Sequence, residues 1–407
     1  SPSSAASDVY KRQMNNIVDF RRTYPDRQFN GERLKIARLW RDISANEMAD
    51  KIGVKRQTIS MYENGKLKNP DIGTIQKISE CLNFPFKFFV EDFNVELEET
   101  TTYFRSLLTT SKKYIEEQES KVTFISIVYE FLKEYLDFEP LDLPQIPQGC
   151  TPEEAATLLR KHWKLGNKPI DNLIYLVESH GLVVTDFETN TGDVDAYSHK
   201  ISSSNTETYL IGFSKNKNAA ARIHFDLAHE LGHILLHDWN EGLSEVKEEF
   251  KELENQANDF AAAFLMPENE FRADIGNYAN KLPYYVELKK RWKVSIAAMI
   301  RRSYSLGLIG NDEYQKMMRN MQKQGIRKVE PLDDTLVTAK PSLLKQAVGI
   351  LLSQGVFTPT ELLDELSSEY GLTLNADDLE NLIGLNRGTL HENSNPPQMK
   401  VNLKNFK

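Results

Sequence analysis

The chain has 407 residues, of which 40% are hydrophobic, and its formal net charge at pH 7 is −9. This length predicts two or three domains, and two cysteines far apart in the sequence do not indicate a disulfide framework. No apolar run approaches the length of a membrane span and no secretory signal is recognisable, so we expect a cytoplasmic protein with no membrane partner.

Residues 1–13 are polar, rich in small residues and without a hydrophobic period. We expect them to lie outside the fold, either as a non-native leader or as a natural disordered tail. Residues 8–13 resemble the translation of a sequencing adapter, and Met14 follows directly, so Met14 is the expected native start.

Residues 28–92 predict a small domain of five short helices. Ser44 with Glu47 three residues later is the capping-box pattern that begins a helix, and Gly53 favours the end of that helix. A second helix is expected over residues 56–64. Two short helices joined through glycine, the second with polar residues on its outer face, form a helix-turn-helix.

The outer face of this second helix carries side chains that can read DNA bases. Arg and Gln pair with guanine and adenine edges in the major groove, and lysines suit phosphates. Cations outnumber anions between residues 33 and 68, against the sign of the whole chain, so a local basic face is expected. The alternative is a helical module that contacts protein. The residues expected to contact DNA are Lys55, Arg56, Gln57, Thr58 and Ser60.

The string GVKRQTISMYENGKLKNP resembles the helix-turn-helix of the Cro and lambda-type repressor (XRE) family, and the resemblance covers roughly residues 31–90. It implies double-stranded operator DNA as a partner, and a homodimer that reads paired half-sites. The family's contacts fall by position on Arg56, Gln57 and Ser60. Ala45 departs from the polar residue that often contacts DNA at the start of the first helix.

Residues 93–149 predict a charged helical connector. Apolar residues recur at helical spacing over residues 122–136, and residues 103–108 form an apolar cluster. Three prolines between residues 138 and 149 mark a domain boundary. We expect a spacer helix packed on the next domain, with an interdomain lever or a dimerisation element as the alternative.

Residues 150–330 predict a second domain, in which three short strands precede a helix that begins near Asn218. This helix contains the motif HELGH over residues 229–233. His229 and His233 are four residues apart and lie on one helix face, so both can reach one small cation. Glu230 can lie beside that cation without filling its coordination sphere. Two histidine ligands, an open position for water and a carboxylate base are the zinc-hydrolase arrangement.

A tetrahedral zinc site needs a third protein ligand. Glu254 heads a predicted helix over residues 254–267, and Asn258 lies one turn later on the same face. We expect Glu254 to coordinate zinc and Asn258 to hold a ligand histidine by a hydrogen bond. The alternative acids for the third ligand are Glu245, Glu248, Glu249 and Glu252. Two further histidines, His224 and His237, are alternative or accessory groups, and His237 is expected mainly to cap or pack the end of its helix. The candidates for a second oxyanion donor are Tyr197 and His224.

Residues of about 153–310 are similar to the ImmA/IrrE family of zinc metallopeptidases. The matching stretches are RKHWKLG, VDAYS, residues 226–237, 254–267 and 288–306. The resemblance implies a gluzincin-type site with His229, His233 and Glu254 as zinc ligands and Glu230 as base. Family members are bacterial regulators linked to mobile elements or DNA damage, in which the peptidase domain cleaves or controls a repressor. Asn258 stands where many gluzincins have Asp, so it adds no charge.

Residues 331–407 predict a small helical region with a loose tail. The expected fold class is α+β and mostly helical: a five-helix helix-turn-helix domain, a helical connector, a zincin-like peptidase domain with a small sheet, and a C-terminal helical unit. The expected function is a DNA-binding regulator whose zinc endopeptidase domain cleaves a repressor or antitoxin in a stress or mobile-element response. The alternative is a transcription regulator whose peptidase-like domain senses zinc or a ligand without proteolysis.

Overall fold

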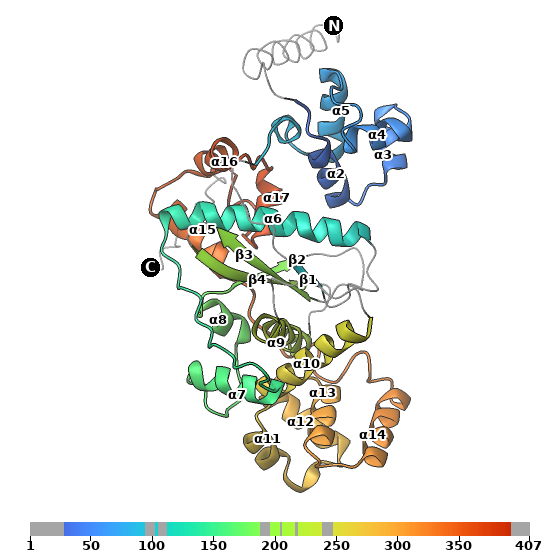
Figure 1. Ribbon diagram of the computed structural model, residues 1–407, viewed down its shortest axis with the longest axis vertical. Helices are drawn as coiled ribbons and strands as arrows, with labels where there is room; N and C mark the ends of the chain where they lie inside the picture. Colours follow the sequence, from blue (N-terminus) through green and yellow to red (C-terminus); the bar gives the residue numbers. More distant parts are fainter. Residues whose placement is uncertain are drawn as a thin grey trace, which may run out of the picture.

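The computed structural model describes residues 28–93, 102–104, 112–187, 196–203, 206–215, 219–237 and 247–391. Helices dominate this part of the chain and surround a small four-stranded sheet, which confirms the predicted α+β class (Figure 1). The predicted leader and the predicted loose tail beyond residue 391 lie outside it. Among the described helices, none is long and apolar enough to cross a membrane.

The N-terminal domain has the five predicted helices. The capping box forms as expected: the Glu47 amide donates to Ser44 Oγ at 3.2 Å, and the Ser44 amide donates to Glu47 Oε2 at 2.7 Å. Gly53 ends that helix with a φ of 76°, a conformation that favours glycine. The helices are α2 (Gly31–Trp40), α3 (Ala45–Ile52), α4 (Arg56–Glu63), α5 (Ile72–Leu82) and the 3-10 helix η1 (Phe86–Val90).

The sheet has the strand order β1-β3-β4-β2, in which β2 is parallel to β4 and the other neighbours are antiparallel. The three predicted strands correspond to β2 (Val183–Phe187), β3 (Ala196–Ser203) and β4 (Thr206–Ser214). Strand β1 (Thr102–Phe104) was not predicted. The prediction of a wholly helical connector is wrong at this point, because β1 is set by pairing with the distant β3, which local helix preference does not reveal.

The sheet separates two apolar cores, so both of its faces are buried. Helix α6 (Lys112–Tyr135) lies across one face and helix α9 (Ala220–Leu236) across the other (Figure 1). Alternate residues of each strand enter different cores, as the pleat requires. The side chains on the α6 side of the sheet include Val183, Tyr197 and Leu210. Those on the α9 side include Val184, Ala196 and Ile211.

The C-terminal helices share one apolar core with α6 and the N-terminal domain. Arg33 of α2 donates to the Gly371 carbonyl at 2.7 Å, and Arg41 makes two hydrogen bonds of 2.7 and 2.6 Å to the Asp378 carboxylate. Helical periodicity predicts that these helices bury one face, but not which partner covers it. The helices are α15 (Leu343–Ser353), α16 (Pro359–Ser368) and α17 (Ala376–Leu382).

The second core lies below the sheet in Figure 1, between α9 and the helices that follow it along the chain. Helix α10 packs along α9 and against α7, so that a buried helix pair supports the sheet. The elements of this part are α7 (Pro152–His162), α8 (Leu173–Glu178), α10 (Lys247–Leu265), α11 (Glu268–Ile275), η2 (Gly276–Tyr278), α12 (Leu282–Trp292), α13 (Ile296–Ser305) and α14 (Asn311–Lys323).

Candidate metal centre and recognition helix

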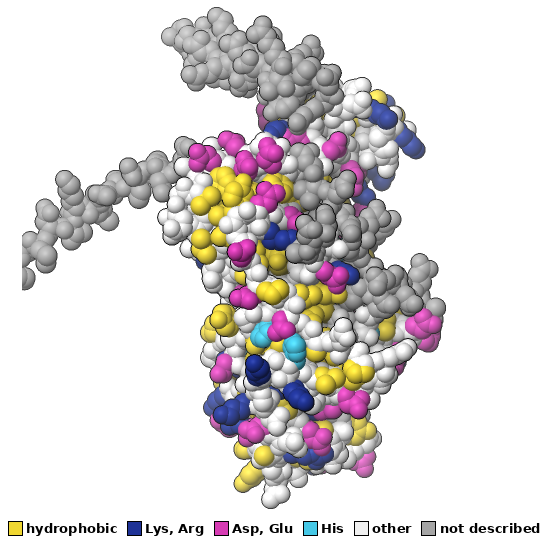
Figure 2. Space-filling view, turned by 60° about the vertical axis from the view of Figure 1, so that its left-hand side comes forward, with side chains coloured by type: hydrophobic (Ala, Val, Ile, Leu, Met, Phe, Trp, Pro, Cys, Tyr) yellow, Lys and Arg dark blue, Asp and Glu magenta, His cyan; other side chains and the backbone are white. Residues whose placement is uncertain are grey.

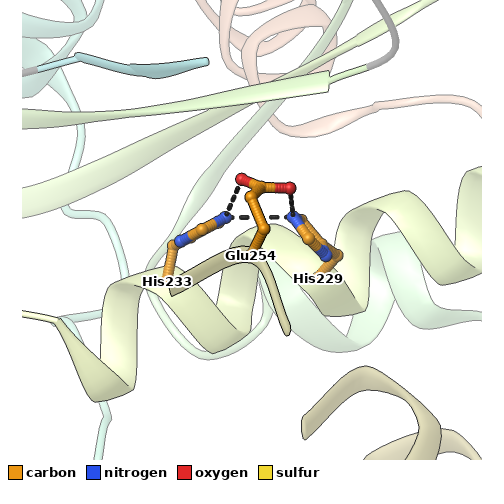
Figure 3. Close-up of side chains that lie close together, drawn as sticks. All are labelled: His229, His233 and Glu254. Carbon is orange, nitrogen blue, oxygen red and sulfur yellow. Dashed lines mark hydrogen bonds and ion pairs between the residues drawn. The ribbon is translucent and has the colours of Figure 1, made fainter. Parts of the chain in front are cut away.

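A close approach of α9 and α10 brings the predicted ligands together. At Gly232, within the HELGH motif, an added Cβ would lie 3.0 Å from the Phe260 ring and 3.2 Å from the Ala257 Cα. Glycine on one helix and alanine on the other therefore permit a short distance between the helix axes. This packing places the side chain of Glu254, on α10, against the histidine face of α9 (Figure 3).

Three side chains converge on one point (Figure 3). The Nε2 atoms of His229 and His233 are 3.0 Å apart, and the Glu254 carboxylate oxygens lie 3.4 Å from the first and 3.2 Å from the second. All ligand atoms of the group fall within 4.8 Å of one another. Two imidazole nitrogens and one carboxylate are a donor set that suits zinc, so the residues present fit the metal that the sequence predicts.

The far side of each imidazole is held by another residue. Asn258 Oδ1 lies 3.1 Å from His229 Nδ1, as predicted, and His237 Nδ1 lies 2.9 Å from His233 Nδ1. Hydrogen bonds at Nδ1 fix the ring orientation and direct Nε2 toward a cation. Burial, followed by the charge of His233, lowers the pKa of His237 to about 4, so this residue is a neutral partner at pH 7. It also caps α9, as predicted.

Glu254 supplies the negative charge of the group. Burial raises the pKa of its carboxyl group, but the two imidazoles outweigh that effect and lower the pKa to about 2. The prediction that Glu254 heads its helix is wrong: α10 begins at Lys247, because the acidic run before Glu254 is itself helix-forming. The alternative acids Glu248, Glu249 and Glu252 are exposed and lie outside the cluster, and Glu245 lies outside the described residues.

Glu230 is fully buried and is held by a residue that the sequence did not single out. Ser198 of β3 is also fully buried, and its Oγ donates to Glu230 Oε2 at 2.7 Å. The alternation of side chains along β3 is the signal that could have identified Ser198 from the sequence. Ser198 lies on the same strand face as Ala196, which enters the core beside α9. A polar side chain on that face needs a partner, and the Glu230 carboxylate is that partner.

If Glu230 acts as the base that the sequence predicts, we expect Ser198→Ala to lower the rate of peptide hydrolysis by about 10- to 100-fold, the equivalent of losing a hydrogen bond to a charged group. Ser198→Thr retains the hydroxyl group and is expected to recover most of the activity. Metal content should be equal in both variants, because neither removes a ligand. Loss of activity in Ser198→Thr as large as in Ser198→Ala, with unchanged metal content, would argue against this positioning role.

Two accessory candidates lie away from the centre. His224 Nε2 is 3.0 Å from Thr338 Oγ1, and burial together with the charge of Lys293 lowers its pKa to about 4. Tyr197 points to the opposite face of the sheet from Ser198, against Phe187, since adjacent strand residues alternate. Neither residue therefore belongs to the candidate metal centre.

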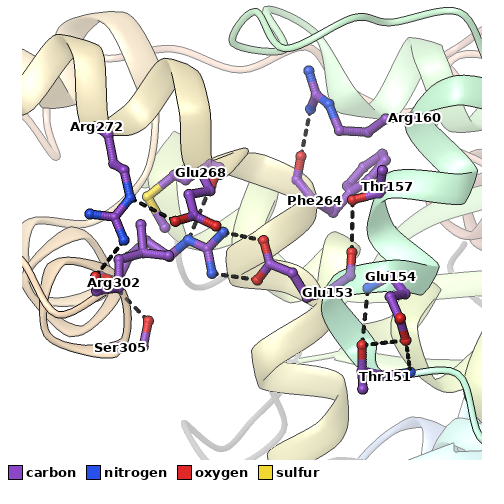
Figure 4. Close-up of polar contacts among 12 residues, drawn as sticks. Thr151, Glu153, Glu154, Thr157, Arg160, Phe264, Glu268, Arg272, Arg302 and Ser305 are labelled. Atoms are coloured by element: carbon purple, nitrogen blue, oxygen red, sulfur yellow. Dashed lines mark hydrogen bonds and ion pairs between the residues drawn. The ribbon is translucent and has the colours of Figure 1, made fainter.

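Two buried arginines fix the C-terminal end of α10 (Figure 4). Arg160 donates to the Phe264 carbonyl at 2.5 Å, and Arg302 donates to the Met266 carbonyl at 3.1 Å. The last carbonyls of a helix have no partner within the helix, and cations there also favour the helix dipole. Arg302 further binds both carboxylate oxygens of Glu153 at 2.7 and 2.6 Å. The helix that carries Glu254 is thus anchored from two sides.

Removing one anchor should destabilise this domain. We expect Arg302→Met to lower the free energy of unfolding by about 2–3 kcal/mol, because it leaves a buried carbonyl and the Glu153 carboxylate without their donor. The neighbouring Arg301 is exposed, so Arg301→Met should change the free energy of unfolding by only about 0.5 kcal/mol. Denaturant unfolding measures both values. Equal losses would contradict the role given to Arg302.

The second candidate site is the outer face of α4. Lys55, Arg56, Gln57 and Ser60 are exposed there, while Thr58 is half-buried; Ile59 and Tyr62 face the core. Arg38 of α2 holds the end of α4 through two hydrogen bonds to Glu63, of 2.5 and 3.0 Å. Figure 2 shows Lys and Arg side chains at the outer end of this domain. The predicted DNA-contact residues therefore form one accessible face of a fixed helix.

Comparison with known proteins matches both parts of the chain. A family model described as "IrrE N-terminal-like domain" (Peptidase_M78) matches residues 177–304, and one described as "Helix-turn-helix" (HTH_3) matches residues 34–89. The SPbeta prophage-derived uncharacterized HTH-type transcriptional regulator YonR of Bacillus subtilis (strain 168) is 31% identical over 105 residues, which are 25% of this chain and 93% of that protein. The first match contains the whole candidate metal centre, and the second contains α4.

Proposed function

Because the chain belongs to the XRE-type helix-turn-helix regulators and carries an ImmA/IrrE-like M78 peptidase domain, we propose that it is a DNA-binding regulator with a zinc-dependent endopeptidase activity. One observation carries the proposal: two histidines and a glutamate converge beside a buried second glutamate. A structural pair of histidines would need neither the carboxylate between the rings nor the fixed carboxylate next to them.

His229, His233 and Glu254 would hold the ion, and a zinc ion bound there supplies Lewis-acid activation of a water molecule and of the scissile carbonyl group. Glu230 accepts the proton of the attacking water at its carboxylate and delivers it to the leaving amine. Ser198 holds that carboxylate in place through its 2.7 Å hydrogen bond. The ligands, the base and the supporting residues all come from α9 with its C-cap His237, from α10 and from β3, which pack together around one core.

The helix-turn-helix domain implies DNA binding, and we propose double-stranded operator DNA as its target, with a homodimer reading paired half-sites. The exposed polar face of α4 supports this target. We further propose that the peptidase acts on a regulatory protein of the repressor or antitoxin type, in the cytoplasm, during a stress or mobile-element response. The pairing of a DNA reader with a peptidase domain in one chain supports this class of substrate.

A second function follows from Asn258, which contacts His229 without adding a negative charge. Beside a neutral partner, the imidazole donates its electron pair to a metal less strongly than it would beside a carboxylate. This weaker coordination suits reversible metal binding. In this alternative the peptidase-like domain is a sensor of zinc or of another ligand and performs no hydrolysis.

One comparison in cells separates the two functions. Glu230→Gln removes the base but no ligand, whereas His229→Ala removes a ligand. The peptidase proposal expects both variants to abolish the induced response of an operator-linked reporter gene. If Glu230→Gln responds like the wild type while His229→Ala does not, the domain is a sensor and the peptidase proposal fails.

A further inference from the structure

Strand β1 covers the outer edge of β3. The two strands are antiparallel, with Thr102 opposite His199, Tyr103 opposite Ser198 and Phe104 opposite Tyr197. The opposite edge of β3 pairs with β4. Because a strand has only two edges, both sets of backbone groups of β3 in this region are already paired by the chain itself.

This covered edge lies next to the catalytic machinery. Ser198, the residue opposite Tyr103, is also the residue whose hydroxyl group contacts Glu230 at 2.7 Å. In Figure 3, β1 and the strands of the sheet run along the side of the cluster toward which the Glu254 carboxylate points. A backbone paired with β3 at this position therefore passes beside the general base and the ligand group.

An extended peptide binds an exposed sheet edge by adding a strand, with its backbone N–H and C=O groups paired to those of the edge. We propose that the outer edge of β3 is the binding place for the substrate backbone and that β1 occupies it as an intramolecular competitor. This inference rests on the proposed peptidase function and adds its regulation. The substrate can enter only when residues 102–104 leave the edge.

The origin of β1 in the chain connects this competition to the DNA-binding domain. The chain that leads to β1 departs from that domain just after Glu91 and Asp92. Asn30, the N-cap of α2, donates to the Asp92 carboxylate at 2.6 Å, and Thr373 of the C-terminal unit donates to Glu91 at 2.7 Å. Strand β1 thus follows, shortly afterwards in the sequence, residues that are anchored on the helix-turn-helix domain and on the C-terminal unit, so the competitor lies close along the chain to the DNA-binding domain.

Proline at position 103 tests the inference without altering a residue of the site. Proline lacks the N–H group and restricts the residue before it, so Tyr103→Pro should release β1, while Tyr103→Val retains a strand-forming residue and is the matched control. In the zinc-loaded protein we expect hydrogen exchange of the amides within residues 197–199 that face β1 to be at least 10-fold faster in Tyr103→Pro than in Tyr103→Val. Exchange over residues 183–187 should be equal. Equal exchange of the amides within residues 197–199 that face β1 would overturn the inference.

A binding measurement gives a second readout. A fluorescein-labelled peptide that copies residues 98–108 is titrated with each variant in a Glu230→Gln background, so that it is not cut. We expect Tyr103→Pro to bind this peptide at least 10-fold more tightly than Tyr103→Val in fluorescence anisotropy. Equal affinity of the two variants would show that β1 does not control access to the edge.

If the proline variant fails to fold, a reversible disulfide that locks β1 onto β3 provides the test instead. In a Cys81→Ser, Cys150→Ser background, Thr102→Cys with His199→Cys places a disulfide across β1 and β3. Oxidation should abolish peptide binding and reduction should restore it; binding unaffected by oxidation contradicts the inference.

The failure of this inference and the failure of the proposed peptidase function remain distinguishable. Cleavage that the disulfide lock does not affect refutes only the role of β1. Peptide binding that the lock controls, in a protein that cuts nothing, refutes only the peptidase.

Discussion

Glu230→Gln is expected to lower the rate of peptide hydrolysis by about 10²- to 10⁴-fold, the usual contribution of a general base. Glutamine has nearly the same volume and can still accept the hydrogen bond from Ser198, but it cannot take a proton from water. The metal ligands His229, His233 and Glu254 are untouched, so the metal content and the thermal unfolding temperature should match the wild type. Hydrolysis of a library of quenched-fluorescent peptides by the zinc-loaded protein measures the effect.

The matched control is Glu249→Gln, the same change at an exposed position of α10 outside the ligand cluster. It should retain the activity of the wild type. Wild-type turnover by Glu230→Gln, with full metal content, would remove Glu230 from the mechanism. Comparable losses in both variants would show that the assay responds to surface charge and not to the base.

The double variant Arg56→Ala, Gln57→Ala is expected to weaken specific DNA binding by roughly 30-fold or more. Each paired hydrogen bond to a base edge is worth about 1–3 kcal/mol of discrimination, and both side chains lie on the exposed face of α4. Fluorescence anisotropy with duplex DNA from the region upstream of the gene measures the affinity, at one fixed salt concentration because phosphate contacts depend on salt.

Gln76→Ala, Lys77→Ala is the control for this experiment. It removes one amide and one cation from α5 of the same domain, outside the predicted recognition helix. We expect at most a few-fold change in affinity, from the lost positive charge. If the two double variants bind the specific duplex equally well, α4 does not read the bases, and the protein-contact role of the domain is the better explanation.

Local signals in the sequence predicted the parts of the molecule that local chemistry determines. The Ser44–Glu47 capping box and the left-handed turn at Gly53 set the helix-turn-helix through contacts within four residues. The same holds for His229 and His233, because the four-residue spacing alone places them on one face. Glu254 and Asn258 required one further assumption, that small residues on α9 and α10 allow close packing, and Gly232 beside Ala257 provides it.

The features that the sequence did not predict depend on contacts between distant segments. Ser198 became part of the site only through the register of β3 above α9, and β1 exists only because the edge of β3 provides pairing groups. The C-terminal unit shows the same limit: its periodicity predicts buried faces, but Arg41 and Asp378, which dock it on the DNA-binding domain, are 337 residues apart. Propensity and periodicity carry no information about such partners.

The metal content of the purified full-length protein is the most direct test of the centre. After incubation with zinc and dialysis, elemental analysis should find about one zinc ion per chain in the wild type, as three protein ligands require. His162→Ala, which removes an exposed histidine elsewhere, should match it, while His233→Ala should lose most of the metal. A wild type that retains no metal, or a His233→Ala variant with the full zinc content, would contradict the account.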